Sequence, residues 1–314
     1  MTNCLHCSIV IPVYGAGHSL LSIVQRCDAT FEQQGIPLAE FIFVDDNGPG
    51  DAWTVIQQLC AERPRTRGLQ LMRNFGQHNA TMCGFAEATG DIVVTLDDDL
   101  QHPPECISAL IKALGDRQAD LVYGEYELKQ HALGRNLGSA VVNWFYRTVF
   151  RLPVTVTSFR AMRRPLVQAI LRYDLNFTFI DGLLAWNTQR IAMVSVPHHQ
   201  RTEGRSGYTL SRLIVLAMNM FTNFSLLPLQ FVSICGLVAS AVGMLLGLYY
   251  LILALFSQIV VPGYASIIVA VMVMGGLQLF SLGIIGEYIG RLHLNVNRKP
   301  QYTIRSRCGA ASCD

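Results

Sequence analysis

Three consecutive aspartates, Asp97, Asp98 and Asp99, follow the strand-like run 92–96 and precede Gln101. Like charges repel one another, so a solvated loop rarely needs three adjacent carboxylates. Alternate residues of an extended segment point to the same side, so Asp97, Asp99 and the amide oxygen of Gln101 could face one ion while Asp98 points elsewhere. Mg²⁺ and Mn²⁺ prefer such oxygen ligands and often bridge to phosphates. The pattern therefore predicts a divalent-cation site, although a D-x-D pair alone also occurs in helix caps and solvated loops.

The first two thirds of the chain alternate strand-like and helix-like segments. Expected strands lie at 8–14, 40–46, 68–72, 91–97 and 119–126. The first expected helix ends near residue 34, the second and third span 52–62 and 78–89, and the fourth runs from 103 to about 114. Gly90 is expected just after the third helix, where glycine commonly ends one. This alternation predicts an α/β fold with a mainly parallel sheet and helices on both faces.

A second acidic pair, Asp45 and Asp46, ends the strand predicted at 40–46. Ligands of open parallel sheets bind beyond the carboxyl ends of the strands, so both acidic clusters should border one cleft. The sequence has no G-x-G-x-x-G after its first strand and no G-x-x-x-x-G-K-[ST], which argues against the usual dinucleotide and P-loop sites.

Two uncharged runs, 229–256 and 264–286, occupy the last third of the chain. As a helix the first would extend about 40 Å, more than the roughly 30 Å hydrocarbon core of a bilayer. Pro262 and Gly263 lie between the runs and are typical of a turn. We therefore predict a two-helix transmembrane hairpin, with a pair of buried core helices as the alternative.

The flanks of this hairpin are basic, whereas its connecting loop carries no charge; the basic residues are Arg201, Arg205, Arg212, Arg291, Arg298 and Lys299. Because positive flanks stay on the cytoplasmic side, both chain ends and the first two thirds of the chain are expected in the cytoplasm, on the inner membrane. The start of the sequence lacks the basic stretch of a signal peptide. The net charge of +2 gives no reason to expect a nucleic-acid partner.

Two further segments, 136–152 and 208–227, are apolar on one side and could lie on a membrane surface or pack into a core. The chain also has nine cysteines with no regular spacing. Cys4 and Cys7 form one C-x-x-C, and the nearest match to a second pair is Cys308 with Cys313 at the far end. We interpret the cysteines as reduced thiols rather than as a metal site.

Several motifs, in this order, resemble those of family 2 glycosyltransferases with the GT-A fold: "VIPVYG", "FVDDNGPGD", "LMRNFGQHNATMCGF" and "LDDDLQHPPE". With "HQRTEGRSGY" and "GEYIGR", the chain is most similar to the polyprenyl-phosphate glycosyltransferases, which include the undecaprenyl-phosphate aminoarabinose transferases. The resemblance implies a Rossmann-like GT-A catalytic domain over 1–207, a juxtamembrane helix over 208–227, a hairpin over 228–290 and a cytoplasmic tail over 291–314.

For the donor, the resemblance implies a nucleotide-sugar, with a UDP-sugar expected. It places the binding residues at Pro12, Val13, Tyr14, Asp45, Asp46 and Asp97. Asp97 and Asp99 would work with Mg²⁺ or Mn²⁺ on the donor diphosphate, and Gln101 would complete the metal ligands. The cation would neutralise the diphosphate as it leaves, while Asp98 is expected to be a spectator.

For the acceptor, the resemblance implies a polyprenyl phosphate, held by Arg160, Arg201, Arg205, Ser206 and Tyr208. Arg160 and Arg201 would act in catalysis with the two aspartates. A lipid phosphate is already anionic near neutral pH, so no general base is needed, and in-line attack with inversion is expected. The alternative is that these arginines only follow the positive-inside rule. The resemblance also implies a homo-oligomer, for example a tetramer.

Three departures from the family pattern leave the sugar unpredicted. Gly15 and Ala16 replace the usual Asn-Glu, Asn47-Gly48-Pro49 replaces the common Gly-Ser turn, and Gly207 replaces the usual Lys. Two other functions compete: a processive polysaccharide synthase, which would carry Q-x-x-R-W and more membrane helices, and a non-catalytic membrane protein. The sequence lacks Q-x-x-R-W, and its apolar runs have no ionisable residue before Glu287.

Overall fold

The computed structural model describes residues 5–15, 17–126, 156–175, 178–197, 227–256, 263–297 and 299–309. The chain forms two compact units, Met1–Ser206 with Arg298–Asp314, and Gly207–Asn297. The segment predicted at 136–152 lies outside the described residues, as does the one predicted at 208–227 apart from its last residue.

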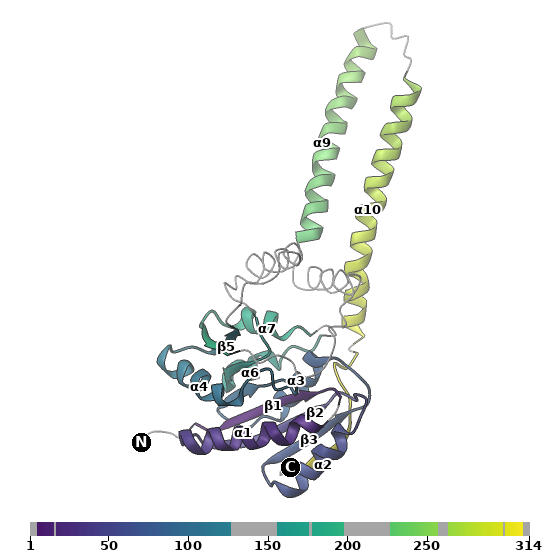
Figure 1. Cartoon of the computed structure of the whole chain (residues 1–314). Coiled ribbons are helices and arrows are strands. Elements are labelled where there is room, and N and C mark those ends of the chain that lie inside the picture. The colour runs from purple at the N-terminus through teal and green to yellow at the C-terminus, as the bar shows by residue number, and fades with distance from the viewer. Residues whose placement is uncertain are drawn as a thin grey trace. The chain divides into compact units, whose positions relative to one another are not determined.

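A sheet forms the centre of the first unit (Figure 1). It has eight strands in the order β7-β5-β6-β4-β1-β2-β3-β8. The strands are β1 (Cys7–Val13), β2 (Leu38–Asp45), β3 (Thr66–Leu71), β4 (Ile92–Thr95), β5 (Leu121–Tyr126), β6 (Arg160–Arg163), β7 (Ile191–Val196) and β8 (Ile304–Gly309). Strands β4, β1, β2 and β3 are parallel to one another, and β5 is parallel to β7. Strands β6 and β8 run antiparallel to their neighbours. The predicted α/β fold with a mainly parallel sheet is confirmed.

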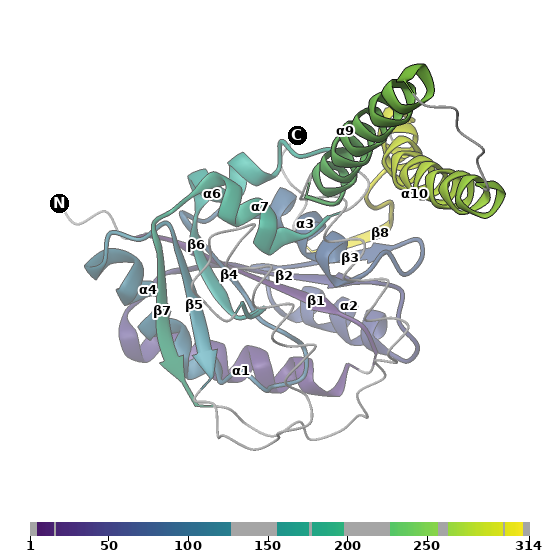
Figure 2. The ribbon, with the colours of Figure 1, turned by 90° about the horizontal axis from the view of Figure 1, so that it is seen from above.

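Helices cover both faces of this sheet, as Figure 2 shows. One face carries α1 (His18–Gln34), α2 (Ala52–Glu62) and α4 (Ile107–Asp116), and the other carries α3 (Gln77–Glu87), α6 (Arg164–Ile170) and α7 (Ile180–Asn187). Side chains alternate along a strand, so Ile9 and Ile11 of β1 pack in the core of the first face. Val10, between them, lies against α3 on the second face. Both faces of β1 are buried, which accounts for its continuous apolar sequence.

The third predicted helix ends earlier than expected, and the role predicted for Gly90 is wrong. Helix α3 stops at Glu87, and Ala88 is already extended. Gly90 instead lies against β1, where a Cβ would come within 2.7 Å of the backbone nitrogen of Ser8. The Gly90 N–H donates to Ser8 Oγ at 2.8 Å. A close approach of two backbones therefore accounts for this glycine.

The end of the chain adds a strand that the sequence reasoning did not predict. Residues 291–314 were expected to be a cytoplasmic tail, but β8 pairs antiparallel with β3 at one edge of the sheet. Its residues alternate between half-buried and exposed, as a strand at the edge of a sheet should. The chain thus returns to the first unit after its long apolar helices.

Gly84 controls how closely α3 packs on the sheet, and hence where α3 places its first residues. A Cβ at Gly84 would overlap with Cγ1 of Val10 and lie 3.3 Å from Cγ2 of Val44. We expect Gly84→Ala to lower the free energy of unfolding by about 1–3 kcal/mol, because the core cannot accept the extra methyl group without shifting. Urea denaturation followed by intrinsic fluorescence would measure the change.

Gly115 in α4 is a matched control, since a Cβ there meets no atom within 4 Å. Gly115→Ala should raise the stability by about 0.5–1 kcal/mol, through helix propensity and lower entropy of the unfolded chain. A Gly84→Ala variant as stable as the wild type would contradict the packing argument.

The second unit contains α9 (Leu227–Phe256) and α10 (Tyr264–Val296), which contact each other (Figure 1). Both contain stretches long and apolar enough to cross a membrane by length and composition, Leu229–Leu246 and Val273–Val296. Their apolar side chains are largely exposed, with Leu237 and Met244 each 73% accessible. The two predicted apolar helices are confirmed, and the alternative of a buried helix pair does not fit this exposure.

Candidate functional site

A cleft of about 290 Å³ lies beyond the carboxyl ends of β1, β2 and β4. Its lining comes from the ends of these strands and from the segment between β3 and α3: Pro12, Val13, Tyr14, Asp46, Asn74, Gly76, Gln77, Asp97, Asp98 and Asp99. Both acidic clusters contribute to it, as the parallel sheet predicted. Most of the residues expected to bind a nucleotide-sugar are therefore brought together.

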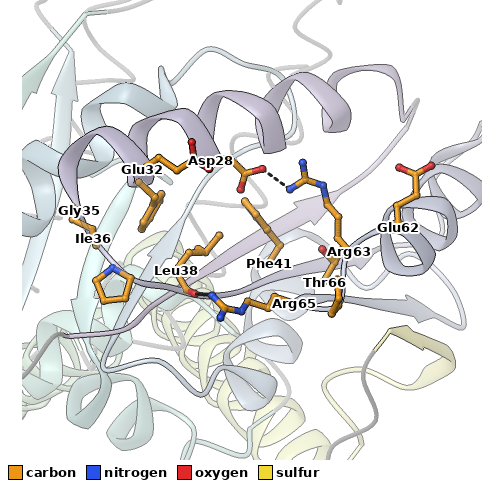
Figure 3. Close-up of a pocket in the computed structure, with 13 residues that line it drawn as sticks. Asp28, Glu32, Gly35, Ile36, Leu38, Phe41, Glu62, Arg63, Arg65 and Thr66 are labelled. Carbon is orange, nitrogen blue, oxygen red and sulfur yellow. Dashed lines mark hydrogen bonds and ion pairs between the residues drawn. The ribbon is translucent and has the colours of Figure 1, made fainter.

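A larger cavity of about 720 Å³ lies at the opposite ends of the strands, between the end of α1 and the starts of β2 and β3 (Figure 3). Both arginines that line it are already engaged: Arg63 pairs with Asp28, and Arg65 Nη1 donates to the Leu38 carbonyl at 3.0 Å. Ligands of open α/β sheets bind at the carboxyl ends, so the smaller acidic cleft is the candidate site.

Asp97 is held from both sides by residues far away in the sequence. Gln77 Nε2, at the start of α3, donates to Asp97 Oδ1 at 2.6 Å, and the Ser158 hydroxyl donates to Oδ2. Burial raises the pKa of Asp97, while the Ser158 hydrogen bond and the charges of His102 and Arg160 act in the opposite direction. The carboxylate orientation is therefore fixed by the surrounding protein.

Asp97, Asp99 and His102 form a cluster whose potential ligand atoms all lie within 4.8 Å of one another. The chain turns sharply between them, because Leu100 adopts φ 57°, a left-handed conformation that is costly for a bulky side chain. The Gln101 N–H donates to Asp99 Oδ1 at 3.1 Å. Asp97 and Asp99 are thus close enough to share a cation, and Gln101 as a ligand stays a prediction.

His102 packs in the core below the acidic loop, since its ring lies 5.1 Å from that of Phe159 and only 3% of the residue is exposed. It also brings Nδ1 to 4.0 Å from Asp97 Oδ2. His102 therefore belongs to the acidic cluster as well as to the core.

Asp98, expected to be a spectator, has a structural contact. Its Oδ2 accepts the backbone N–H of Tyr14 at 3.0 Å, which connects the end of β1 to the acidic loop. Burial raises the pKa of Asp98 to about 6, with the neighbouring carboxylates adding to the rise and the Tyr14 hydrogen bond opposing it. Asp98 also lines the cleft, but it is not part of the cluster of Asp97, Asp99 and His102.

Asp45 and Asp46 differ in their relation to the cleft. Asp46 lines it, but its two oxygens accept the backbone N–H groups of Phe75 and Gly76 at 2.7 and 2.8 Å. Asp45 is 3% exposed, lies outside the lining, and accepts a hydrogen bond from Gln70 at 3.2 Å. Asp46 therefore holds the segment that brings Asn74, Gly76 and Gln77 to the cleft.

Arg160, expected at the acceptor phosphate, is buried at the start of β6, with 3% of its surface exposed. It forms an ion pair with Asp181 near the start of α7, and Tyr123 Oη donates to the same carboxylate at 3.0 Å. The Nε atom of Arg160 is buried without a hydrogen-bond partner among the described residues. Arg160 pairs with Thr95 in the ladder between β4 and β6, two residues before Asp97, and its charge acts to lower the pKa of Asp97.

His78 belongs to the same buried region. Its ring contacts Phe179 at 5.4 Å in an edge-on arrangement. Burial lowers the pKa of His78, and the positive charge of Arg160 adds to this while Asp181 opposes it. The lowered pKa favours the neutral form of the buried His78 side chain near pH 7.

Four of the residues expected at the acceptor phosphate, Arg201, Arg205, Ser206 and Tyr208, lie outside the described residues. Sequence reasoning missed Gln77, Ser158 and Asp181. Gln77 lies within the motif "RNFGQHNATMCGF", so the sequence offered a local signal for it. Ser158 is 61 residues from its partner Asp97, and Asp181 is 21 residues from its partner Arg160, so no local pattern marks these two contacts.

Comparison with known proteins agrees with this geometry. Residues 8–171, more than half of the chain, match the model of glycosyl transferase family 2, and residues 227–292 match that of the GtrB C-terminal hairpin. A solved structure, glucosyl-3-phosphoglycerate synthase from Mycobacterium tuberculosis with Mn²⁺, UDP and glucosyl-3-phosphoglycerate, superposes with a TM-score of 0.51. It is 16% identical and covers 69% of this chain and 78% of its own, so the likeness concerns the fold alone.

Two curated relatives are similar over almost their full lengths. The undecaprenyl-phosphate 4-deoxy-4-formamido-L-arabinose transferase of Pectobacterium atrosepticum is 34% identical over 311 residues, which covers 97% of this chain and 94% of the relative. The enzyme of the same name from Klebsiella pneumoniae subsp. pneumoniae is 33% identical over 306 residues, covering 95% and 92%. On the family match, this identity and the acidic cleft, the chain belongs to glycosyl transferase family 2 and is a glycosyltransferase.

Proposed function

We propose that the chain transfers a sugar from a nucleotide-sugar, with a UDP-sugar as donor, to a polyprenyl phosphate, with undecaprenyl phosphate as the acceptor. The observation that carries this proposal is the full-length similarity to transferases whose names specify undecaprenyl phosphate. The match to a C-terminal hairpin model and the two apolar helices support a lipid acceptor, because a polyprenyl chain must stay in the membrane.

The donor would occupy the cleft at the carboxyl ends of β1, β2 and β4. Its lining includes Pro12 and Val13 as well as Asp97 and Asp99. The apolar residues suit a nucleoside, and the carboxylates suit a diphosphate with its cation. Asp46 would hold the segment beneath the nucleotide through Phe75 and Gly76.

Mg²⁺ or Mn²⁺ would be held by Asp97 and Asp99, with Gln101 or His102 beside them. Carboxylate oxygens suit these hard cations, and the potential ligand atoms of Asp97, Asp99 and His102 lie within 4.8 Å of one another, so the residues fit the ion. The cation would neutralise the leaving diphosphate. Ser158 and Gln77 orient Asp97 for this task.

The proposed transfer reaction needs no general base. A lipid phosphate is anionic near neutral pH, so the remaining work is to align it with the anomeric carbon. Arg160, whose charge acts to lower the pKa of Asp97, would supply fixed positive charge near the site. The other proposed acceptor residues are Arg201, Arg205, Ser206 and Tyr208.

A transfer assay with a donor panel tests the proposal. Membranes containing the full chain would be incubated with UDP-, GDP- and TDP-sugars and with undecaprenyl phosphate, and the lipid product identified by mass spectrometry. We expect sugar-labelled undecaprenyl phosphate with a UDP-sugar and not with membranes lacking the protein. Labelling only with a GDP- or TDP-sugar would correct the donor, and growing polymer in place of a single glycolipid would favour a processive synthase.

The acceptor arginines give a prediction about a conservative change. Arg201→Lys keeps the charge but loses the planar fork that binds phosphate oxygens in pairs. Transfer should fall by at least about tenfold, or roughly 1.4 kcal/mol. Donor binding, measured by calorimetry with UDP and Mn²⁺, should stay at the wild-type value. Transfer at the wild-type rate would mean that Arg201 only serves as a membrane-flanking charge.

The proposed orientation places the domain of residues 1–207 and both chain ends in the cytoplasm, on the inner membrane, because the basic flanks should stay inside. In sealed right-side-out vesicles, an impermeant maleimide should label Val260→Cys and leave Cys313 unmodified until the membrane is opened. Peptide mass spectrometry would locate the label at each position. Labelling of Cys313 and protection of Val260→Cys in intact vesicles would reverse the orientation.

A further inference from the structure

Two cysteines far apart in the sequence meet at the edge of the sheet. Cys60 lies in α2 and Cys308 in β8, and their sulfur atoms are 3.0 Å apart across 248 residues of chain. This separation is shorter than an ordinary van der Waals contact between two thiols, and it exceeds the roughly 2.05 Å of a disulfide by about 1 Å. Small movements of the two side chains would therefore allow a covalent bond.

Gly68 of β3 makes the space in which the two sulfurs meet. It is paired with Cys308 in the antiparallel ladder between β3 and β8. A Cβ at Gly68 would come within 2.5 Å of Cys308 Sγ and 3.3 Å of Cys60 Sγ. Any larger residue at this position would push the sulfurs apart, so the contact is built from three elements and is not a chance approach of loose side chains.

The pair is more exposed than three of the other described cysteines. Cys7, Cys27 and Cys83 are buried in the core, whereas Cys60 and Cys308 are partly exposed and can be reached by a small oxidant. Cys106 is partly exposed as well, but it makes no thiol–thiol contact among the described residues, which makes it a suitable control.

We propose that Cys60 and Cys308 form a reversible disulfide that fastens the C-terminal strand β8 to α2. With glutathione disulfide as oxidant, the thiolate of one cysteine attacks a glutathione sulfur and releases one reduced glutathione. The second protein thiolate then attacks the mixed disulfide, forms the Cys60–Cys308 bond and releases the second glutathione. The protein loses two protons and two electrons, and both pass to the two glutathione molecules.

The bond would act on the segment that leads into the acidic cleft. Strand β8 and the residues before it hold Met72 on both sides: the Met72 N–H donates to the Thr303 carbonyl at 2.9 Å, and Arg305 Nη2 donates to the Met72 carbonyl at 2.8 Å. The cleft residues Asn74 and Gly76 follow directly. Fastening β8 would therefore reduce local opening of the chain next to the cleft.

Burial raises the pKa of both thiols, so only a small fraction is thiolate near pH 7. Exchange should accordingly be slow at neutral pH and become faster as the pH rises, because the thiolate is the attacking species. The two thiols should therefore react slowly, unlike a catalytic cysteine, whose thiol has a lowered pKa.

The test uses the full-length protein in membranes, at pH 8, with and without glutathione disulfide. Free thiols are blocked with N-ethylmaleimide, the protein is digested, and peptides are analysed by mass spectrometry. We expect a cross-linked peptide pair containing Cys60 and Cys308 that appears with the oxidant and disappears with dithiothreitol. Cys106→Ser should form it as the wild type does, and Cys60→Ser should not.

Hydrogen exchange provides the second readout on the wild-type protein. Amides of residues 68–72 and 304–309 should exchange at least about tenfold more slowly after oxidation than after reduction, since a cross-link suppresses local opening. Recovery of Cys60 and Cys308 as blocked free thiols, or as separate adducts with glutathione, would overturn the proposal. A cross-link without slower exchange would overturn the fastening of β8.

Discussion

Replacing Asp99 with Asn should reduce sugar transfer by on the order of a hundred- to a thousandfold, because the variant removes one charged ligand from the proposed cation. Asp99 lies with Asp97 and His102 in a cluster whose ligand atoms fall within 4.8 Å. The amide of Asn is nearly the same size as the carboxylate, so folding should be preserved. Initial rates with donor and undecaprenyl phosphate, together with circular dichroism, would measure both effects.

Asp116→Asn is a matched control, since Asp116 is an exposed carboxylate at the end of α4, outside the cleft. It should transfer sugar at the wild-type rate. Excess EDTA should abolish transfer by the wild-type protein, and added Mn²⁺ should restore it. Full activity in EDTA, or in Asp99→Asn, would show that the acidic cluster does not act through a cation.

Replacing Asp181 with Asn should destabilise the first unit by about 3–5 kcal/mol, since it leaves the buried Arg160 charge without its ionic partner. Arg160 is 3% exposed and Asp181 7%. The same change takes a charged acceptor away from the Tyr123 hydroxyl. The midpoint of thermal unfolding, followed by tryptophan fluorescence, should fall by roughly 6–20 °C.

Two comparisons separate this explanation from a general loss of packing. Glu105→Gln removes the partner of Arg26 in an exposed ion pair and should cost at most about 1 kcal/mol. A double variant with Arg160→Met and Asp181→Leu removes both buried charges and should recover much of the lost stability. If Asp181→Asn were as stable as the wild type, Arg160 would not depend on this ion pair.

Much of the framework was determined locally by the sequence. The five strands β1–β5 and the helices between them followed from alternating apolar segments, because the period of side-chain burial differs between a strand and a helix. The acidic clusters at the ends of β2 and β4 had to share one edge, since parallel strands end together. The two apolar helices followed from composition alone, because no other part of the chain could bury such long uncharged runs.

Only the tertiary structure decided how the acidic site is supported. Strand β6 inserts antiparallel between β4 and β5, and this places Ser158 beside Asp97 and Arg160 beside Tyr123. Strand β8 returns after the apolar helices and brings Cys308 to Cys60. Short strands such as β6 and β8 carry weak local patterns, and the choice of a partner strand depends on packing between residues far apart in the chain. Periodicity shows which side of a segment is buried, but it does not show which other segment covers that side.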